Sequence, residues 1–285
     1  MKWEGRREST NVDDRRGMST GGMVAGGGIV GVVIWLLVAF LGGDTSQLPS
    51  PLEQRPAGTP QPMSPAEKQA DNARASFVKV VLADTEDVWG KIFAENGQRY
   101  PAPTLVMFYG IVQSACGRAS SASGPFYCPG DQKLYIDLTF FEEMQNNLNA
   151  PGDFAMAYVV AHEVGHHIQT INGTSEKIQR MRSRVSEAEG NRLSVMMELQ
   201  ADFLAGVWAH HAQKMKNILD PGDIEEALNA ANAIGDDRLQ KRSTGTVMPD
   251  AFTHGTSAQR VYWFKKGFET GDLNQGNTFD GIDPR

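Results

Sequence analysis

Two short patterns in this chain contain the residue types of a metal-dependent hydrolytic site. Residues 162–166 read HEVGH, an HExxH box, and residues 198–202 read ELQAD, an ExxxD box. On a helix, residues four apart lie on one face, so His162 and His166 would direct both imidazoles at one ion. Zinc accepts imidazole nitrogen at about 2.0–2.1 Å. Glu163 would lie beside the ion, where a general base accepts a proton from water.

The residues around the first box predict the helix that it needs. Residues 153–170 contain no proline, Asp153 is a plausible N-cap, and Asn172 with Gly173 is a plausible stop. His167 follows the box by one residue and is therefore turned away from the ligand face by about 100°. We expect His167 to be a non-ligand.

A catalytic zinc has three protein ligands, so one more must come from elsewhere. Glu198 is the preferred candidate, on a predicted helix over residues 192–214, and Asp202 would lie on the same face. A carboxylate at Asp202 could accept the free ring N–H of a ligand histidine and fix its tautomer. His210, His211 and His254 remain alternative third ligands. A metzincin site is excluded, because residues 169 and 172 are Gln and Asn where that pattern needs Gly and His.

His254 stands in a predicted loop between Thr253 and Gly255. A histidine there could donate a hydrogen bond to the oxyanion of a tetrahedral intermediate. The alternative is a surface or capping histidine.

Composition limits the possible partners. The chain has 285 residues, a formal net charge of −7 and a pI near 5.4, which argue against nucleic acid as a partner. The two cysteines, Cys116 and Cys128, lie in a Gly/Ser-rich stretch and predict a disulfide in an exported domain. Two free thiols are the alternative.

Residues 21–43 predict a transmembrane anchor in the lipid bilayer. Residues 23–41 are almost all apolar or glycine, and as a helix they would span about 28 Å. Basic residues precede this stretch and Asp44 follows it, so the positive-inside rule puts the N-terminus in the cytoplasm and the rest outside. A cleaved signal peptide, a buried core helix and a twin-arginine signal fit the sequence less well.

The rest of the chain predicts an α+β, mostly helical fold with four segments. Residues 1–20 are expected to be a loose cytoplasmic tail, 21–43 the anchor, 44–63 a Pro-rich linker, and 64–285 the folded domain. Further helices are predicted from Ser64 to about Phe93, over 223–234 and over 256–268. Residues 104–110 and 133–138 are predicted strands, interpreted as a long-looped hairpin whose edge could align a peptide substrate. Residues 271–285 are expected to be a loose tail.

The motifs together resemble those of a known family, the neutral zinc metallopeptidases, which are bacterial membrane-anchored proteins. The resemblance covers roughly residues 65–280 and rests on the stretches 77–89, 114–117, 124–129, 161–167, 198–202 and 252–255. It implies a zincin-like metallopeptidase domain with one zinc on His162, His166 and Glu198, and with Glu163 as the base. Relatives often carry cysteines where this chain has Phe203 and Asn277, which suggests one missing disulfide.

The sequence thus predicts a zinc-dependent endopeptidase that hydrolyses peptide or protein substrates outside a bacterial inner membrane, attached by a single-pass anchor. Two alternatives stay open. The first is a non-catalytic zincin-like domain that binds zinc or a partner for structure, although a purely structural zinc needs no base beside it. The second is an aminopeptidase, for which the sequence offers no obvious acidic clamp for a free amino terminus.

Overall fold

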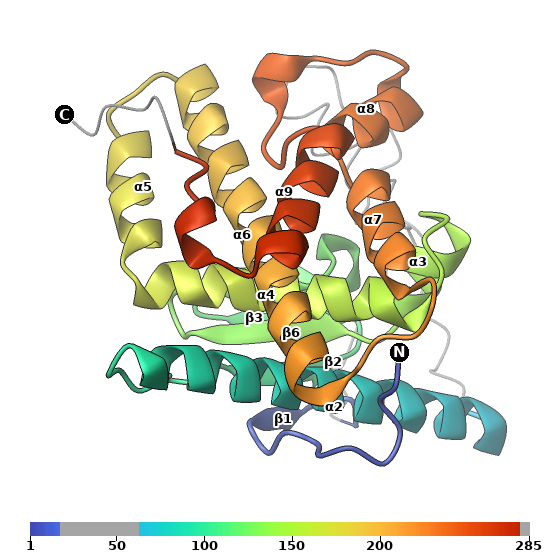
Figure 1. Ribbon diagram of the computed structural model, residues 1–285. Helices are drawn as coiled ribbons and strands as arrows, with labels where there is room; N and C mark the ends of the chain where they lie inside the picture. The colour runs from blue at the N-terminus through green and yellow to red at the C-terminus, as the bar shows by residue number, and fades with distance from the viewer. Residues whose placement is uncertain (18–62, 280–285) are drawn as a thin grey trace.

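The computed structural model describes residues 1–17 and 63–279 (Figure 1). In this part of the chain the fold is α+β and mostly helical, as predicted. The helices are α2 (Pro65–Glu95), α3 (Phe140–Asn146), α4 (Asp153–Ile171), α5 (Thr174–Arg182), α6 (Glu187–Lys216), α7 (Asp223–Ala233), α8 (Asp236–Thr244) and α9 (Ser257–Thr270). Short 3₁₀ turns occur at η2 (Ser121–Ser123), η3 (Pro249–Ala251) and η4 (Leu273–Gln275).

Helix α4, which carries the HExxH box, runs through the centre of the molecule (Figure 1). It packs against α6 and α7 on one side and against α2 and the sheet on the other. Fifteen of its nineteen residues are buried. The predicted helix from Ser64 is also confirmed as α2, where the Ser64 side chain and Glu67 form a capping box.

The predicted hairpin of residues 104–110 and 133–138 is wrong. These segments form β2 (Thr104–Phe108) and β6 (Lys133–Asp137), which pair in parallel inside a four-stranded sheet of order β1-β2-β6-β5. The last four residues of each strand are all buried, as expected of strands covered on both faces, and the long connection between them permits a crossover.

The edge strand of the sheet that lies next to α4 is β5 (Phe126–Cys128), which pairs antiparallel with β6. The predicted hairpin therefore does not provide this edge. A separate hairpin of β3 (Ile111–Ser114) and β4 (Gly117–Ser120) precedes β5. The predicted disulfide between Cys116 and Cys128 is present and joins the end of β5 to the turn of this hairpin. The crosslink therefore restrains the edge strand that faces α4.

Glycines set the spacing of the helices around the site. A Cβ added at Gly206 of α6 would lie 2.1 Å from the carbonyl oxygen of Phe264, and one at Gly267 of α9 would lie 2.1 Å from that of Phe203. A Cβ added at Gly165, inside the HExxH box, would lie 3.0 Å from the backbone of Ala201. Close approach of α4, α6 and α9 thus requires small residues at these crossings.

The prediction of a loose tail for residues 1–20 is wrong for residues 1–17. This N-terminal segment contains β1 (Val12–Asp14), which pairs in parallel with β2 at the sheet edge, and its Trp3 ring contacts Phe77 of α2. The segment runs along α2 in Figure 1. Strand pairing and apolar contact outweigh the polar composition that suggested disorder.

The predicted anchor, residues 21–43, and almost all of the predicted linker lie outside the described residues. Within residues 1–17 and 63–279, no helix has the length and apolar character needed to span a bilayer.

The C-terminal residues 271–279 are also better ordered than predicted. Thr278 donates a hydrogen bond to the carbonyl of Met196, and the amide of Gln200 donates to that of Gly276. The Phe203 ring packs against Gly276, the residue before Asn277, so apolar contact also holds this part of the C-terminal segment.

Candidate metal centre

The structure brings the two boxes together. His162 and His166 of α4 and Glu198 of α6 form a cluster in which one ligand atom from each lies within 4.8 Å of the others. His162 Nε2 lies 3.1 Å from Glu198 Oε2 and 3.2 Å from His166 Nε2. His166 Nε2 lies 3.5 Å from Glu198 Oε1.

These distances fit a tetrahedral zinc site. With metal–ligand bonds of about 2.0–2.1 Å at tetrahedral angles, neighbouring ligand atoms should be separated by about 3.3 Å. Two separations from His162 Nε2, 3.1 Å to Glu198 Oε2 and 3.2 Å to His166 Nε2, lie close to that value, and His166 Nε2 lies 3.5 Å from the other carboxylate oxygen, Oε1. Two imidazole nitrogens and one carboxylate form a donor set that zinc accepts.

A buried carboxylate orients the first histidine. Asp202 Oδ1 lies 2.8 Å from His162 Nδ1, and since a carboxylate can only accept, Nδ1 carries the hydrogen and Nε2 keeps its lone pair for a metal. Asp202 is completely buried and also accepts from both Nε and Nη2 of Arg260, at 2.8 and 2.9 Å. The Tyr158 hydroxyl donates to the same carboxylate oxygen.

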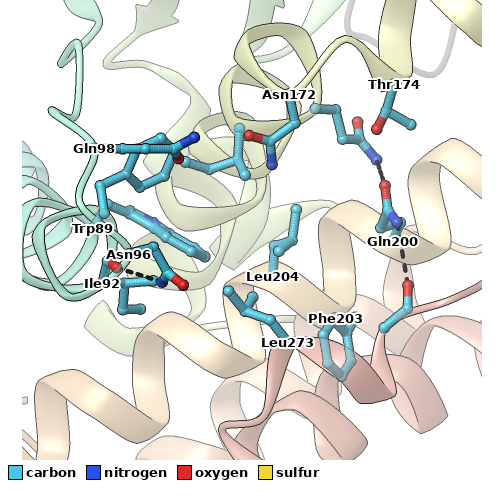
Figure 2. Close-up of a pocket in the computed structure, with 14 residues that line it drawn as sticks. Trp89, Ile92, Asn96, Gln98, Asn172, Thr174, Gln200, Phe203, Leu204 and Leu273 are labelled. Carbon is cyan, nitrogen blue, oxygen red and sulfur yellow. Dashed lines mark hydrogen bonds between the residues drawn. The ribbon is translucent and has the colours of Figure 1, made fainter.

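An amide orients the second histidine. Gln169 Oε1 accepts from His166 Nδ1 at 2.9 Å, so this ring also presents Nε2 to the cluster. The amide nitrogen of Gln169 donates to the carbonyl of Met197 and to Gln200 of α6. Gln200 in turn donates to the carbonyl of Gly276, which extends this series of hydrogen bonds. Figure 2 shows Gln200 at one side of a pocket of about 480 Å³, which is separate from the cleft at the cluster. Gln169 therefore fixes the His166 ring relative to both helices.

The electrostatics of the cluster favour positive charge. Burial lowers the pKa of His162, but the charge and hydrogen bond of Asp202 outweigh it and raise the pKa above its usual value. Burial also lowers the pKa of His166, but the nearby Glu198 carboxylate has the larger effect and raises this pKa to about 9. Burial would raise the pKa of Glu198, yet the two histidines hold it well below its usual range.

A second carboxylate lies on an adjacent face of α4. Glu163 is buried and lines the same cleft as the cluster, and burial raises the pKa of its carboxyl. The backbone of Tyr127 in β5 partly opposes this and lowers the pKa. The predicted base is thus brought between the cluster and the exposed strand edge.

His167 holds this strand edge against α4. Its Nδ1 lies 3.0 Å from the Tyr127 hydroxyl, and its Nε2 lies 2.6 Å from the carbonyl oxygen of Pro101. The ring is buried and turned away from the cluster, in agreement with the prediction that it is not a ligand.

His254 lines the cleft but is not part of the cluster. Its Nδ1 lies 3.1 Å from Asp236 Oδ1, and the second Asp236 oxygen accepts the backbone N–H groups of Thr253, His254 and Gly255. The side chain is 50% exposed. Partial desolvation in the cleft lowers the pKa of His254, but the Asp236 hydrogen bond and the charge of Glu198 raise it overall.

The other candidate ligands lie elsewhere. His210 Nδ1 contacts the carbonyl of Phe268 and His211 Nε2 contacts that of Gly271. Both histidines therefore connect α6 to the end of α9.

Sequence reasoning missed five residues that shape this site. Arg260, Tyr158, Gln169, Asp236 and Tyr127 contact the cluster, its base or His254. Tyr158 lies four residues before His162 on the predicted helix and could have been found by helical spacing. Arg260 and Asp236 lie on α9 and α8, and their partners depend on tertiary packing.

The cleft around the cluster has a volume of about 900 Å³. One part has apolar walls from α3, α4 and α8, including Phe140, Val159 and Leu239, whereas another is lined by α5 and α6. The Phe126 and Tyr127 residues of β5 lie along it.

Comparison with known proteins agrees with this geometry. Residues 1–279 match the family described as "Putative neutral zinc metallopeptidase", and the chain belongs to that family. It is 48% identical over 288 residues to a protein of Escherichia coli strain K12 named "Uncharacterized protein YpfJ", covering 98% of this chain and 99% of that one. A Mycobacterium tuberculosis H37Rv protein, "Uncharacterized protein Rv2575", is 43% identical over 194 residues, covering 65% of this chain and 64% of its own. No solved structure matches.

Proposed function

We propose that this protein is a zinc-dependent peptidase, with an endopeptidase action on peptide or protein substrates. The observation that carries the proposal is the spacing of the His162, His166 and Glu198 ligand atoms, which fits one tetrahedral zinc ion. Family membership supports the same reaction class. We further propose that the domain is zincin-like, because a histidine pair on one helix is completed by a carboxylate from a second.

Each residue of the site has a role in this proposal. His162, His166 and Glu198 would hold the ion, while Asp202 and Gln169 orient the two imidazoles. Zinc, when bound, would supply Lewis acidity that polarises a carbonyl and lowers the pKa of a water molecule. Glu163 would accept a proton from the attacking water and later return it to the leaving amine.

The position of His254 suits a donor to developing negative charge. Asp236 accepts from its Nδ1 and from its backbone N–H, so the imidazole is held in one orientation at the cleft. Its Nε2 could then donate a hydrogen bond to the carbonyl oxygen as that oxygen becomes negative.

Strand β5 is the proposed guide for an extended substrate. It is a sheet edge, it lies against α4, and its residues line the cleft beside Glu163. An unpaired edge can bind a peptide by adding it as a strand. A cleft lined by several elements on both sides of the cluster suits the interior of a chain, which favours endopeptidase action.

Attachment to a bacterial inner membrane through residues 21–43, with an extracytoplasmic site, remains a proposal that rests on the composition of that segment and on the disulfide.

The test compares the full-length wild type with Glu163→Gln, which removes the basic oxygen but preserves the shape of the side chain. We expect the wild type to cleave unfolded casein at internal bonds, Glu163→Gln to lose at least about 100-fold in rate, and both to hold about one zinc by metal analysis. His211→Gln is the matched control, since this residue lies outside the cluster. Zinc in both proteins without cleavage by either would reject the peptidase and favour a structural zinc domain.

A further inference from the structure

The basic residues that precede the predicted anchor are used as structural partners. The N-terminal segment contains five of them, Lys2, Arg6, Arg7, Arg15 and Arg16. The side chain of each is paired with an acidic residue of the described structure, and in four of the five pairs that acidic residue belongs to the folded domain. These charges were the basis for placing the N-terminus in the cytoplasm.

One of these contacts joins three parts of the fold. Arg6 and Lys216 of α6 both donate to Asp84 of α2, a side chain that is almost completely buried. Arg7 lies 2.7 Å from Asp87, one turn further along α2, and Lys216 contacts that carboxylate as well. A buried carboxylate needs such cations, because water is excluded from it.

The other end of the segment is held by the sheet. Strand β1 pairs with β2 over three residues, the N–H of Leu105 donates to the carbonyl of Asn11, and the N–H of Arg15 donates to that of Met107. Arg16 then reaches α2, where its guanidinium lies 2.6 Å from Asp71. Between the two ends, the backbone N–H of Ser9 donates to the carbonyl of Lys79. The segment is therefore an integral part of the fold along its whole length.

We propose that residues 1–17 occupy the same side of the membrane as the candidate metal centre. Contacts of about 3 Å cannot form across a hydrocarbon core about 30 Å thick. A single crossing between residues 17 and 63 and the observed packing are mutually exclusive. This inference concerns topology alone and does not depend on the proposed peptidase activity.

The basic residues of the N-terminal segment are compatible with a location outside the cytoplasm. The positive-inside rule concerns basic residues retained at the cytoplasmic face of a membrane. Here the carboxylates of Asp84, Asp87 and Asp71 account for three of the arginines. The disulfide between Cys116 and Cys128 favours an oxidising compartment for the domain. Because the N-terminal segment packs against this domain, it must lie in the same compartment.

The test maps two surface positions in cells that produce the full-length chain. Glu4 and Lys91 are exposed, the first in the N-terminal segment and the second on α2. Glu4→Cys and Lys91→Cys are each treated with a membrane-impermeant maleimide polymer, before and after the membrane is permeabilised, and the wild type serves as the background control. We expect both positions to react under the same condition, and the disulfide predicts reaction before permeabilisation. Reaction of one position before and of the other only after permeabilisation overturns the proposal.

A second measurement tests the docking itself. Glu8 lies 3.6 Å from Lys79, so a zero-length carbodiimide should join these two side chains by an amide bond in the membrane-associated protein. Glu8→Gln removes the reactive carboxylate and is the matched control. A peptide pair that contains this link, seen by mass spectrometry in the wild type alone, supports the proposal. Absence of this crosslinked peptide pair in both proteins would show that the N-terminal segment does not pack against α2 in the membrane-associated protein.

Discussion

At the scale of single residues, Asp202 is the group on which the candidate centre depends most. It is completely buried and accepts hydrogen bonds from His162, Tyr158 and Arg260. Burial would raise the pKa of this carboxyl, but the charges of Arg260 and His162 hold it at about 2. The carboxylate therefore stays ionised and can orient the histidine ring, provided that Arg260 remains in place.

Removing Arg260 tests this dependence. Arg260→Leu should leave the Asp202 charge without its cation and lower the free energy of unfolding by about 3–5 kcal/mol, the usual effect of breaking a buried ion pair. The measurement is urea unfolding of the full chain. Lys265→Leu on the same helix is the control, because its pair with Glu269 is exposed and should contribute less than about 1 kcal/mol. Equal effects of the two substitutions would show that Asp202 has other compensation.

At the scale of elements, the crossing of α6 and α9 positions the cluster, because α6 carries Glu198 and α9 carries Arg260. A methyl group at Gly206 would lie 2.1 Å from the carbonyl oxygen of Phe264. Gly206→Ala should therefore separate the helices and destabilise the fold by about 3 kcal/mol or more.

A second glycine of α6 provides the matched control for this prediction. A Cβ at Gly190 would have only the Arg182 guanidine, at 4.0 Å, as a neighbour. Gly190→Ala should raise the free energy of unfolding by about 0.4–1 kcal/mol, since alanine loses less backbone entropy on folding. The two variants are compared by thermal unfolding, and a similar shift in both would contradict the role of Gly206 at the crossing.

Elements differed in how far the sequence could predict them. The helices that carry the two boxes were predictable, because their signals are local: caps, absence of proline and the spacing of apolar residues. The direction of β6 relative to β2 was not, since a five-residue strand such as KLYID does not by itself specify the direction of its partner. Strand β5 has only three residues, and β1 obtains its partner from a segment some ninety residues away. Such elements are defined by tertiary contacts.

The candidate site shows the same division. Spacing within one helix placed His162 beside His166, and spacing within another placed Glu198 beside Asp202. The need for a third zinc ligand allowed Glu198 to be proposed from the sequence, but the facing of the two helices and the 3.1 Å approach of His162 to Glu198 depend on tertiary packing. No local pattern linked Asp236 to His254, because their contact depends on a turn between α8 and α9.

At the scale of the whole molecule, the N-terminal segment connects α2, α6 and the sheet, and acidity should weaken this connection. Burial opposes ionisation of Asp87, but Lys216 and Arg7 hold its pKa below the ordinary value of about 3.9. A carboxyl with a lowered folded-state pKa stabilises the fold above its unfolded pKa. That contribution is lost as the pH falls through the lower, folded value.

The prediction is that Asp87→Asn lowers the melting temperature by about 2–4 °C at pH 7, equivalent to about 1 kcal/mol for a partly exposed ion-pair network. The difference from the wild type should shrink as the pH falls below about 4, where the wild-type carboxyl also becomes protonated. Asp84 nearby responds in the opposite sense, since burial and the Asp87 charge raise its pKa. Asp250→Asn is the control, because that side chain is 82% exposed and lies 3.8 Å from its nearest cation. A difference for Asp87→Asn that persists unchanged at pH 3 would show that the asparagine alters packing rather than charge, and the N-terminal segment would then not be held by this ion pair.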